Sequence, residues 1–504
     1  RSRLLVFVPL VAALYMFVWP TAARLIAAPK DAPLFPQFTN HLVTTEFWAT
    51  FPPFAVAVPF LFICGFLTVY FLGSKGFCTY GCPYGGFFSL ADKVAPGKIR
   101  VTDACNQCGH CTATCTSNVI VHAEVAKYGM VVDPGCMKCM DCVSVCPNDA
   151  LYFGFGKPAV GVKQTIAKNY SLTWPEEILA AAVFAASFLG VWDVYQLVPM
   201  LMALGVAAVT TYLAMRGIRL FRAADLSFYR FNLKSAGRMH AAGWAFIGFA
   251  ALWIGLNAHS GWVHYHESAG SVAFQNLQIP DELALAQVNP ARWLSASDQK
   301  NIAAGKQHYR DAVDYGLFTN ADALPKYAWF EFLSGDTELA VQILGRAADH
   351  QTGQARALSL YYRGAILNRM GRNDDALSSL DAALAERPDL IVAGEERGVS
   401  LWQLGRKQDA AAAWNESIAK NAGLPLAYSF LAGASASAGD TEQAVAYDKQ
   451  ADQYIPKDPL FHWMLRLRLH ETGMNPLAEK HFQQAIQLNP EFRRARDQKP
   501  SPIR

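Results

Sequence analysis

One cysteine pattern occurs twice in the sequence, with the same spacing in both copies. The first copy reads Cys105-Asn-Gln-Cys108-Gly-His-Cys111-Thr-Ala-Thr-Cys115, and the second reads Cys136-Met-Lys-Cys139-Met-Asp-Cys142-Val-Ser-Val-Cys146-Pro147. In each copy three thiols fall within one short loop, and a fourth follows after three more residues. Such a loop can wrap one small inorganic cluster with three thiolates, while the fourth thiolate comes from farther along the chain. These two runs therefore decide the fold of this part of the chain.

This spacing is that of bacterial proteins with two [4Fe–4S] clusters, in which the fourth cysteine of each run binds the other cluster. The rule assigns one cluster to Cys105, Cys108, Cys111 and Cys146, and the second cluster to Cys136, Cys139, Cys142 and Cys115. Zinc sites also use closely spaced cysteines, but two complete four-cysteine runs in tandem are not a zinc pattern. We expect a small α+β ferredoxin domain that carries single electrons.

Composition limits the remaining possibilities. A chain of 504 residues is too long for one compact domain. Hydrophobic residues make up 52% of it, which indicates membrane segments, and a net charge of +3 gives no reason to expect a nucleic-acid partner. All 11 cysteines precede residue 147, whereas a disulfide-stapled scaffold would be short and carry cysteines along its length.

Five stretches are apolar enough to cross a bilayer, which takes about 20 residues. They are residues 4–26, 53–72, 175–191, 197–215 and 241–256. Basic residues follow the second stretch and fill the connection between the fourth and fifth stretches, so the positive-inside rule places both segments in the cytoplasm. The sequence thus predicts a multi-pass protein of the bacterial inner membrane, with the cysteine runs cytoplasmic and the C-terminal half periplasmic.

The C-terminal half carries an internal repeat. Glycines recur every 34 residues, and an alanine follows each of them by five residues; the pairs are Gly371/Ala376, Gly405/Ala410, Gly439/Ala444 and Gly473/Ala478. A 34-residue period of paired helices is typical of tetratricopeptide repeats, in which small residues let the two helices approach closely. Stacked helix pairs form a concave surface that docks a peptide or protein. An irregular helical domain is the alternative interpretation.

The fold class expected is therefore mainly α, with about five transmembrane helices, an inserted two-cluster ferredoxin domain and a C-terminal α-solenoid. The boundaries expected are 1–76 for the first two spans, 77–160 for the cysteine motifs, 161–260 for the last three spans, 261–325 for a connector, 326–493 for the repeats and 494–504 for a tail.

A second cysteine motif, Cys78-x3-Cys82-Pro83, lies where the second apolar stretch ends. Two thiols near the positive charge of Lys75 can be redox-active or contact a metal; the alternative is a structural turn with buried thiols. The order of parts over residues 1–260 resembles the membrane-bound polyferredoxin family, which includes the NapH-type, NosR-type and CcoG-type proteins. In that family a CxxxCP motif at a helix end precedes a cytoplasmic two-cluster segment. This chain differs in having one such motif and in carrying repeats where the CcoG type has a β-sandwich.

Four histidines flank the fifth apolar stretch, namely His240, His259, His264 and His266. They could hold a haem, or a transition metal such as copper, for which imidazole is a suitable ligand. The alternative is that they are ordinary polar residues at the membrane interface. His110 and Lys138, which lie between cluster ligands, could tune a cluster by charge or hydrogen bonding.

These features predict an electron-transfer subunit rather than a stand-alone enzyme. Electrons would pass between a cytoplasmic or quinone-pool donor and a redox complex docked by the repeats, with a quinone or haem bridging the bilayer. The resemblance to the CcoG type suggests the alternative of an assembly factor that reduces copper or a thiol during biogenesis of a respiratory metalloenzyme. In a third interpretation the clusters are structural and the chain is a scaffold.

Overall fold

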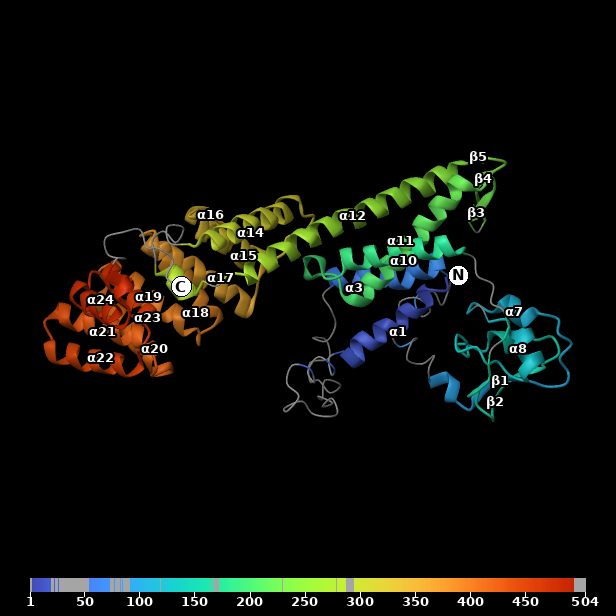
Figure 1. Ribbon diagram of the computed structural model, residues 1–504, viewed down its shortest axis with the longest axis horizontal. Coiled ribbons are helices and arrows are strands. Elements are labelled where there is room, and N and C mark those ends of the chain that lie inside the picture. The colour runs from blue at the N-terminus through green and yellow to red at the C-terminus, as the bar shows by residue number, and fades with distance from the viewer. Residues whose placement is uncertain are drawn as a thin grey trace. The chain divides into compact units, whose positions relative to one another are not determined.

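The computed structural model describes residues 2–19, 22, 26, 54–72, 77, 82, 84, 91–117, 119–163, 165–166, 172–228, 230–277, 279–286 and 294–493. The described chain is mainly helical and has two small antiparallel sheets (Figure 1). Its contacts divide it into two compact units, Arg1–Trp262 and Val263–Arg504.

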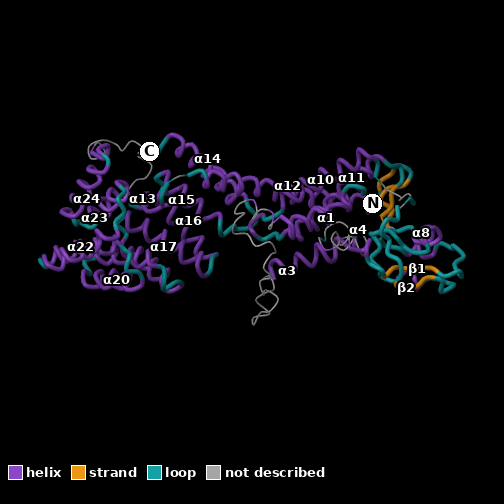
Figure 2. Tube along the Cα trace, turned by 60° about the horizontal axis from the view of Figure 1, so that its bottom comes forward, coloured by secondary structure: helices purple, strands orange, loops and turns teal. Residues whose placement is uncertain are grey.

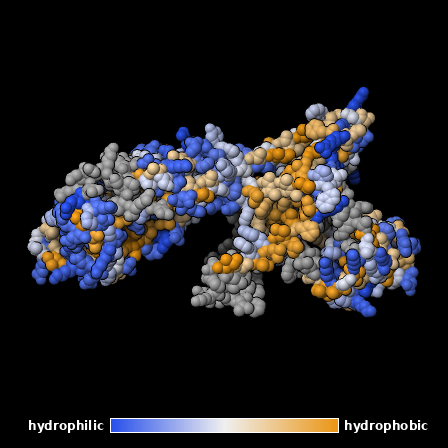
Figure 3. Space-filling model, in the orientation of Figure 1, coloured by the Kyte–Doolittle hydropathy of each residue, from blue (hydrophilic) through white to orange (hydrophobic). Residues whose placement is uncertain are grey.

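Four helices in the described part of the N-terminal unit are long and apolar enough to cross a membrane. The first is a continuous run of α3 (Phe54–Phe60), a π-helical stretch (Leu61–Leu67) and α4 (Thr68–Leu72); the others are α10 (Trp174–Val191), α11 (Met200–Arg222) and α12 (Ala241–Gln275). The most apolar window of α11 is 61% buried, whereas those of the other three are 17–22% buried. An apolar helix with so little burial suits a lipid environment, and hydrophobic residues cover this unit's helices in Figure 3.

The described residues hold four such helices rather than the predicted five, and the fifth predicted span, residues 4–26, lies partly outside the described residues. The first apolar stretch is helical only from Leu5 in the described run, as a 3-10 turn (Leu5–Phe7), α1 (Val8–Ala13) and a π-helical stretch (Leu14–Val18). Trp19, Ala22 and Ile26 are helical as well. Of the rest of that stretch only residues 19, 22 and 26 are described.

A polar network joins three of these apolar helices. The hydroxyl of Ser187 on α10 donates to the side-chain oxygen of Asn257 on α12 at 2.9 Å. The hydroxyl of Thr210 on α11 lies 3.2 Å from the same oxygen and 2.8 Å from the carbonyl of Val206, and its one proton is shared between these two acceptors. The indole of Trp253 donates to the Thr210 hydroxyl at 2.9 Å. Nearby, a Cβ on Gly190 would lie 3.0 Å from the Cα of Gly261, so only a small residue fits where α10 and α12 approach.

A compact α+β segment lies between the first two of these spans. Strands β1 (Gly97–Val101) and β2 (Leu151–Phe155) pair antiparallel with Gly97 opposite Phe155. Between them come α7 (His110–Thr114), α8 (Val121–Tyr128) and α9 (Asp141–Ser144). Valines of the loops and of α8 pack on Ile99 and Leu151 of the two strands, and this small core also includes the thiols of Cys111 and Cys142. A second sheet, β3 (Leu226–Phe228), β4 (Phe231–Ser235) and β5 (Arg238–Met239), connects α11 to α12.

The C-terminal unit is entirely helical in its described part, as the purple helices of Figure 2 show. Its helices are α13 (Asp281–Leu285), α14 (Ala296–Tyr315), α15 (Ala323–Ser334), α16 (Thr337–His350), α17 (Gly353–Arg369), α18 (Asn373–Glu386), α19 (Ile391–Gln403), α20 (Lys407–Lys420), α21 (Pro425–Ala438), α22 (Thr441–Tyr454), α23 (Pro459–Glu471), α24 (Asn475–Leu488) and a 3-10 turn (Pro490–Arg493).

The predicted helical repeat is confirmed as a series of paired helices. Each repeat glycine lies in the turn between two paired helices and is left-handed, with φ of 74°, 79°, 85° and 77° at Gly371, Gly405, Gly439 and Gly473. Most other residues would be strained there. The four repeat alanines are all buried between the helices of their pair.

The stretch from 261 to 325, for which the sequence predicts a connector, contains the last turns of α12 together with α13 and α14. Ala273, Leu285 and Tyr309 from these three helices join one hydrophobic core with Phe330 of α15. This stretch therefore packs with the repeats, and the boundary between the two units falls inside α12.

Candidate functional site

The two cysteine runs fold into two loops with the same backbone. The residue before the second cysteine of each run is left-handed, with φ of 57° at Gln107 and 49° at Lys138. The residue after that cysteine is also left-handed, with φ of 81° at Gly109 and 68° at Met140. Alternating backbone conformations of this kind turn successive amide groups toward one concave side, a geometry found at many iron–sulfur sites.

Hydrogen bonds repeat between the loops as well. The amide that follows the third cysteine donates to the carbonyl of Gly109 in the first run (3.0 Å) and of Met140 in the second (2.9 Å). The amides of Cys115 and Cys146 each donate, at 3.2 Å, to the carbonyl three residues earlier. Each loop therefore passes into one helical turn, α7 or α9, that ends at the fourth cysteine. Equal spacing in the sequence has produced equal geometry.

The thiols assigned to the first cluster surround one cavity. Cys105, Cys108 and Cys111 line a space of about 320 Å³ together with Cys146, which comes from the other run. Of these four residues Cys111 is buried, Cys108 is exposed and the other two are half-buried. A cubane takes one thiolate on each iron, so its ligands surround it rather than converge on a point. Among the described residues, no three Cys, His, Asp or Glu side chains converge on a single metal ion.

The thiols assigned to the second cluster also lie close enough to influence one another. Burial raises the pKa of Cys142 to about 12, and the neighbouring Cys136, Cys115 and Cys139 add to the shift. Burial likewise raises the pKa of Cys136 to about 11, with Cys115 and Cys139 again among the causes. The raised pKa values make the Cys136 and Cys142 thiols poor thiolates on their own, so iron is the charge that would make them ligands.

Residues outside the runs hold the loops in place. The side chain of the buried Glu124 on α8 accepts hydrogen bonds from the backbone amides of Val132 and Asp133, at 2.8 and 3.0 Å. These bonds fix the chain that leads to Cys136. Lys138 lies 2.5 Å from Asp92, which also pairs with the buried Lys98. Lys138 thus shares one carboxylate with Lys98, while His110 is exposed.

The sequence analysis overlooked His122, which lines the cavity of the first four thiols. Its Nδ1 atom lies 2.8 Å from the hydroxyl of Thr112, and its backbone amide donates to the same hydroxyl at 3.0 Å. His122 comes after the first run ends, so no spacing rule marks it; only the fold brings it to the cavity.

The remaining predicted site residues do not form one site in the described structure. Cys78 lies outside the described residues; Cys82 is half-buried, and its amide donates to the carbonyl of Phe77 at 2.9 Å. His240 directly precedes α12, and His259 lies about 28 Å farther along the helix axis, at 1.5 Å per residue.

The two other histidines of α12 differ from each other. His264 is half-buried, whereas His266 meets His308 of α14, with their Nδ1 atoms 3.1 Å apart, and lies 3.6 Å from Asp311. Nothing in the described residues supports a quinone or haem site.

Comparisons with known proteins support the iron–sulfur interpretation of the cysteine runs. A family model described as a 4Fe-4S dicluster domain matches residues 104–151. Two uncharacterized proteins of Methanocaldococcus jannaschii are similar to this chain, at 24% identity over 102 residues and 26% over 95 residues. These matches cover 20% and 19% of this chain, and the chain spans only 40% and 36% of the two relatives.

Among solved structures, two MamA structures are similar to part of this chain. A crystal structure of MamA matches with a TM-score of 0.29 and 20% identity, over 32% of this chain and 95% of that one. A MamA fragment from Desulfovibrio magneticus matches with a TM-score of 0.27 and 21% identity, over 35% of this chain and 97% of that one. TM-scores this low do not establish a shared fold.

Proposed function

We propose that this chain is a membrane-anchored iron–sulfur electron carrier with two [4Fe–4S] clusters. The observation that carries the proposal is the pair of equivalent loops, together with a cavity that brings Cys146 beside Cys105, Cys108 and Cys111. A bound cubane supplies reversible one-electron chemistry. The chain supplies the thiolates, two amide-lined loops and a small apolar core that packs against Cys111 and Cys142.

The exposure of the thiols favours electron exchange at the protein surface. Cys108 and Cys139 hold equivalent positions in the two loops, and both are exposed. A cluster bound there would have one corner near the surface, where a donor or acceptor protein can approach it. Cys111 and Cys142 hold the opposite, buried side of each loop.

The other domains place this carrier at a membrane and beside a partner protein. The apolar helices hold the cluster segment at a membrane, and the helix pairs of the C-terminal unit offer a surface on which a partner redox protein can dock. We propose that electrons pass between a donor on the cluster side and that partner.

The test is anaerobic purification in detergent, iron quantitation and a redox titration followed by EPR. We expect about eight irons per chain and reversible signals from two clusters. Iron well below eight, or clusters that cannot be reduced and reoxidised, would contradict the proposal. Cys64→Ser, at a buried position within the first membrane span, is the matched control and should leave the iron content unchanged.

Serine variants also test which thiols share a cluster. Because Cys146 lines the same cavity as Cys105, Cys146→Ser and Cys105→Ser should alter the same EPR signal. Cys115→Ser and Cys136→Ser should alter the other signal. If Cys146→Ser instead alters the signal that Cys136→Ser alters, each run binds its own cluster and the crossed assignment is wrong.

A further inference from the structure

A short segment that precedes the repeats is enclosed by them. It comprises Pro280–Ala286 and includes α13, whose Leu283, Ala284 and Leu285 are buried. Leu283 packs against Trp463 of α23 and Phe482 of α24, near the end of the repeats. Leu285 belongs instead to the core that includes α15 and α17, near their beginning. The segment therefore bridges repeats that are far apart in the sequence.

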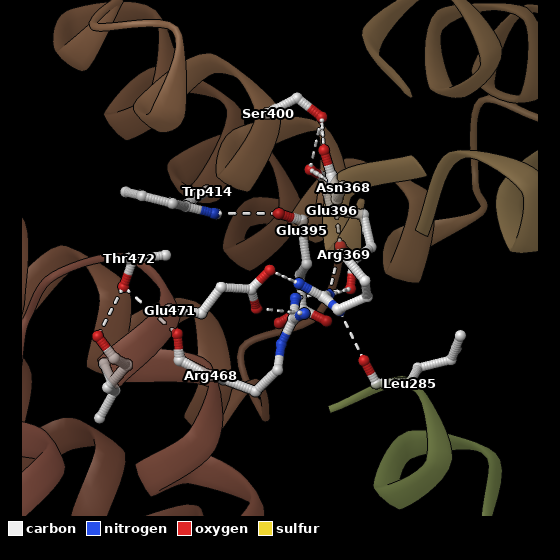
Figure 4. A network of polar contacts seen from close by, with 11 residues as sticks. Leu285, Asn368, Arg369, Glu395, Glu396, Ser400, Trp414, Arg468, Glu471 and Thr472 are labelled. Atoms are coloured by element: carbon white, nitrogen blue, oxygen red, sulfur yellow. Dashed lines mark hydrogen bonds and ion pairs between the residues drawn. The ribbon is translucent and has the colours of Figure 1, made fainter. Parts of the chain in front are cut away.

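Polar groups of the repeats also bind this segment. The hydroxyl of Tyr362 on α17 donates to the Asp281 carboxylate at 2.5 Å. Arg369, at the end of the same helix, donates from Nε to the carbonyl of Leu285 at 2.5 Å, as Figure 4 shows. The repeats thus contact one carboxylate, one main-chain carbonyl and two leucine side chains of the segment. Repeat proteins bind peptides through contacts of the same kinds.

The groups that hold the segment are fixed by one another. Arg369 pairs with Glu396 of α19 at 3.1 Å and with Glu471 of α23. Arg468 of α23 pairs with the same Glu396 at 2.6 Å. Glu396 and Glu471 thus hold the Arg369 guanidinium in position for the Leu285 carbonyl, and Arg468 pairs with both carboxylates (Figure 4).

The segment has little structure of its own to contribute. A helix of five residues is far too short to be stable alone, so its conformation depends on the groups around it. The segment therefore resembles a peptide bound to the repeats, although it belongs to the same chain.

We propose that the repeats contain a peptide-binding site that residues Pro280–Ala286 occupy, and that a partner protein docks by inserting a segment of the same chemistry in their place. That segment would carry an acidic residue followed within one turn by two leucines that flank a small residue. This inference rests on the proposed docking role of the repeats and adds the chemistry of the partner to it.

The test measures binding of a labelled synthetic peptide with the sequence of residues 279–286, Ile-Pro-Asp-Glu-Leu-Ala-Leu-Ala, to the full-length protein in detergent by fluorescence anisotropy. The attached segment competes at a high effective concentration, so the wild type should bind the peptide weakly. Leu283→Ser/Leu285→Ser weakens that competitor and should bind about tenfold more tightly or better. A peptide with serine at both leucine positions is the matched control and should not bind.

Asp281→Asn is a milder variant in case the double variant does not fold. It alters one exposed side chain, which accepts a hydrogen bond from the Tyr362 hydroxyl. It should give a several-fold gain in peptide binding, together with faster hydrogen exchange of the amides of residues 283–286.

If folded variants bind the peptide no better than the wild type, the segment is a permanent part of the fold and the inference is overturned. Iron content and EPR signals, measured on the same samples, separate this result from a failure of the electron-carrier proposal.

Discussion

At the scale of single residues, the repeats contain a buried carboxyl group, that of Glu395, for which no ion pair is found among the described residues. Arg369 and Arg468 pair with Glu396 and Glu471, so those four charges cancel. The adjacent Glu395 is also buried, and none of the described ion pairs includes it. Burial raises the pKa of Glu395 to about 8, and the nearby charge of Glu396 contributes. The folded protein therefore keeps a proton on Glu395 that the unfolded chain loses near its ordinary pKa of 4.5.

This proton makes the stability of the repeats depend on pH. Below pH 4.5 both states hold the proton, and as the pH rises toward 8 only the unfolded chain releases it, so stability falls across that window. Glu395→Gln removes the effect and should gain on the order of a few kcal/mol over the wild type between pH 5 and pH 8. Unfolding midpoints at both pH values measure this gain, with the exposed Glu442→Gln as control. A difference between Glu395→Gln and wild type that does not change with pH would refute the assignment.

The cluster segment shows which features the sequence could predict and which it could not. The cysteine spacing predicted two equivalent loops, and the shared left-handed residues such as Gly109 and Met140 agree with it, because coordination chemistry fixes distances along the chain. The same spacing could not predict that Lys138 pairs with Asp92 or that His122 lines the first cavity. Those contacts depend on how separate elements pack, which a local pattern does not encode.

At the scale of elements, the polar network between α10, α11 and α12 should stabilise the membrane part. Asn257→Leu removes the acceptor of the Ser187 and Thr210 hydroxyls. A hydrogen bond between membrane helices is worth about 0.6 kcal/mol on average and at most about 1.7, so the variant should lose roughly 1–2 kcal/mol. Thermal unfolding in detergent measures the loss, with Leu256→Ala, at an exposed position of the same helix, as control. An equal effect of both substitutions would show that the network contributes nothing.

The length of α12 shows that a helix can extend beyond its apolar stretch. The sequence predicts that the last span ends at residue 256, where polar residues such as His259 and His264 begin. The helix instead continues to Gln275 and is about 50 Å long, at 1.5 Å per residue. Polar residues end an apolar stretch, but a helix needs a terminating signal such as glycine or proline in the right place to stop. Gly261 and Gly270 lie within α12 and do not end it.

At the scale of the whole molecule, the number of spans decides which side each domain occupies. Three apolar helices, α10, α11 and α12, separate the cysteine runs from the repeats. If all three cross the membrane, an odd number of crossings puts the two domains on opposite sides. This conclusion does not depend on whether residues 4–26 form a span. Basic residues between α11 and α12, such as Arg230 and Arg238, favour the cytoplasm for the cluster side.

Single cysteines can test this arrangement, since no native cysteine follows Cys146. Glu442→Cys, exposed on α22, should react in intact bacterial cells with a maleimide that cannot cross the inner membrane, because the repeats would be periplasmic. Arg238→Cys, exposed just before α12, should react only after the cells are lysed; unmodified protein gives the background from native thiols. The opposite result would reverse the protein in the membrane and put the clusters in the periplasm. Labelling of both variants in intact cells would place both residues on the same side, and α12, which lies between them, would then not be a span.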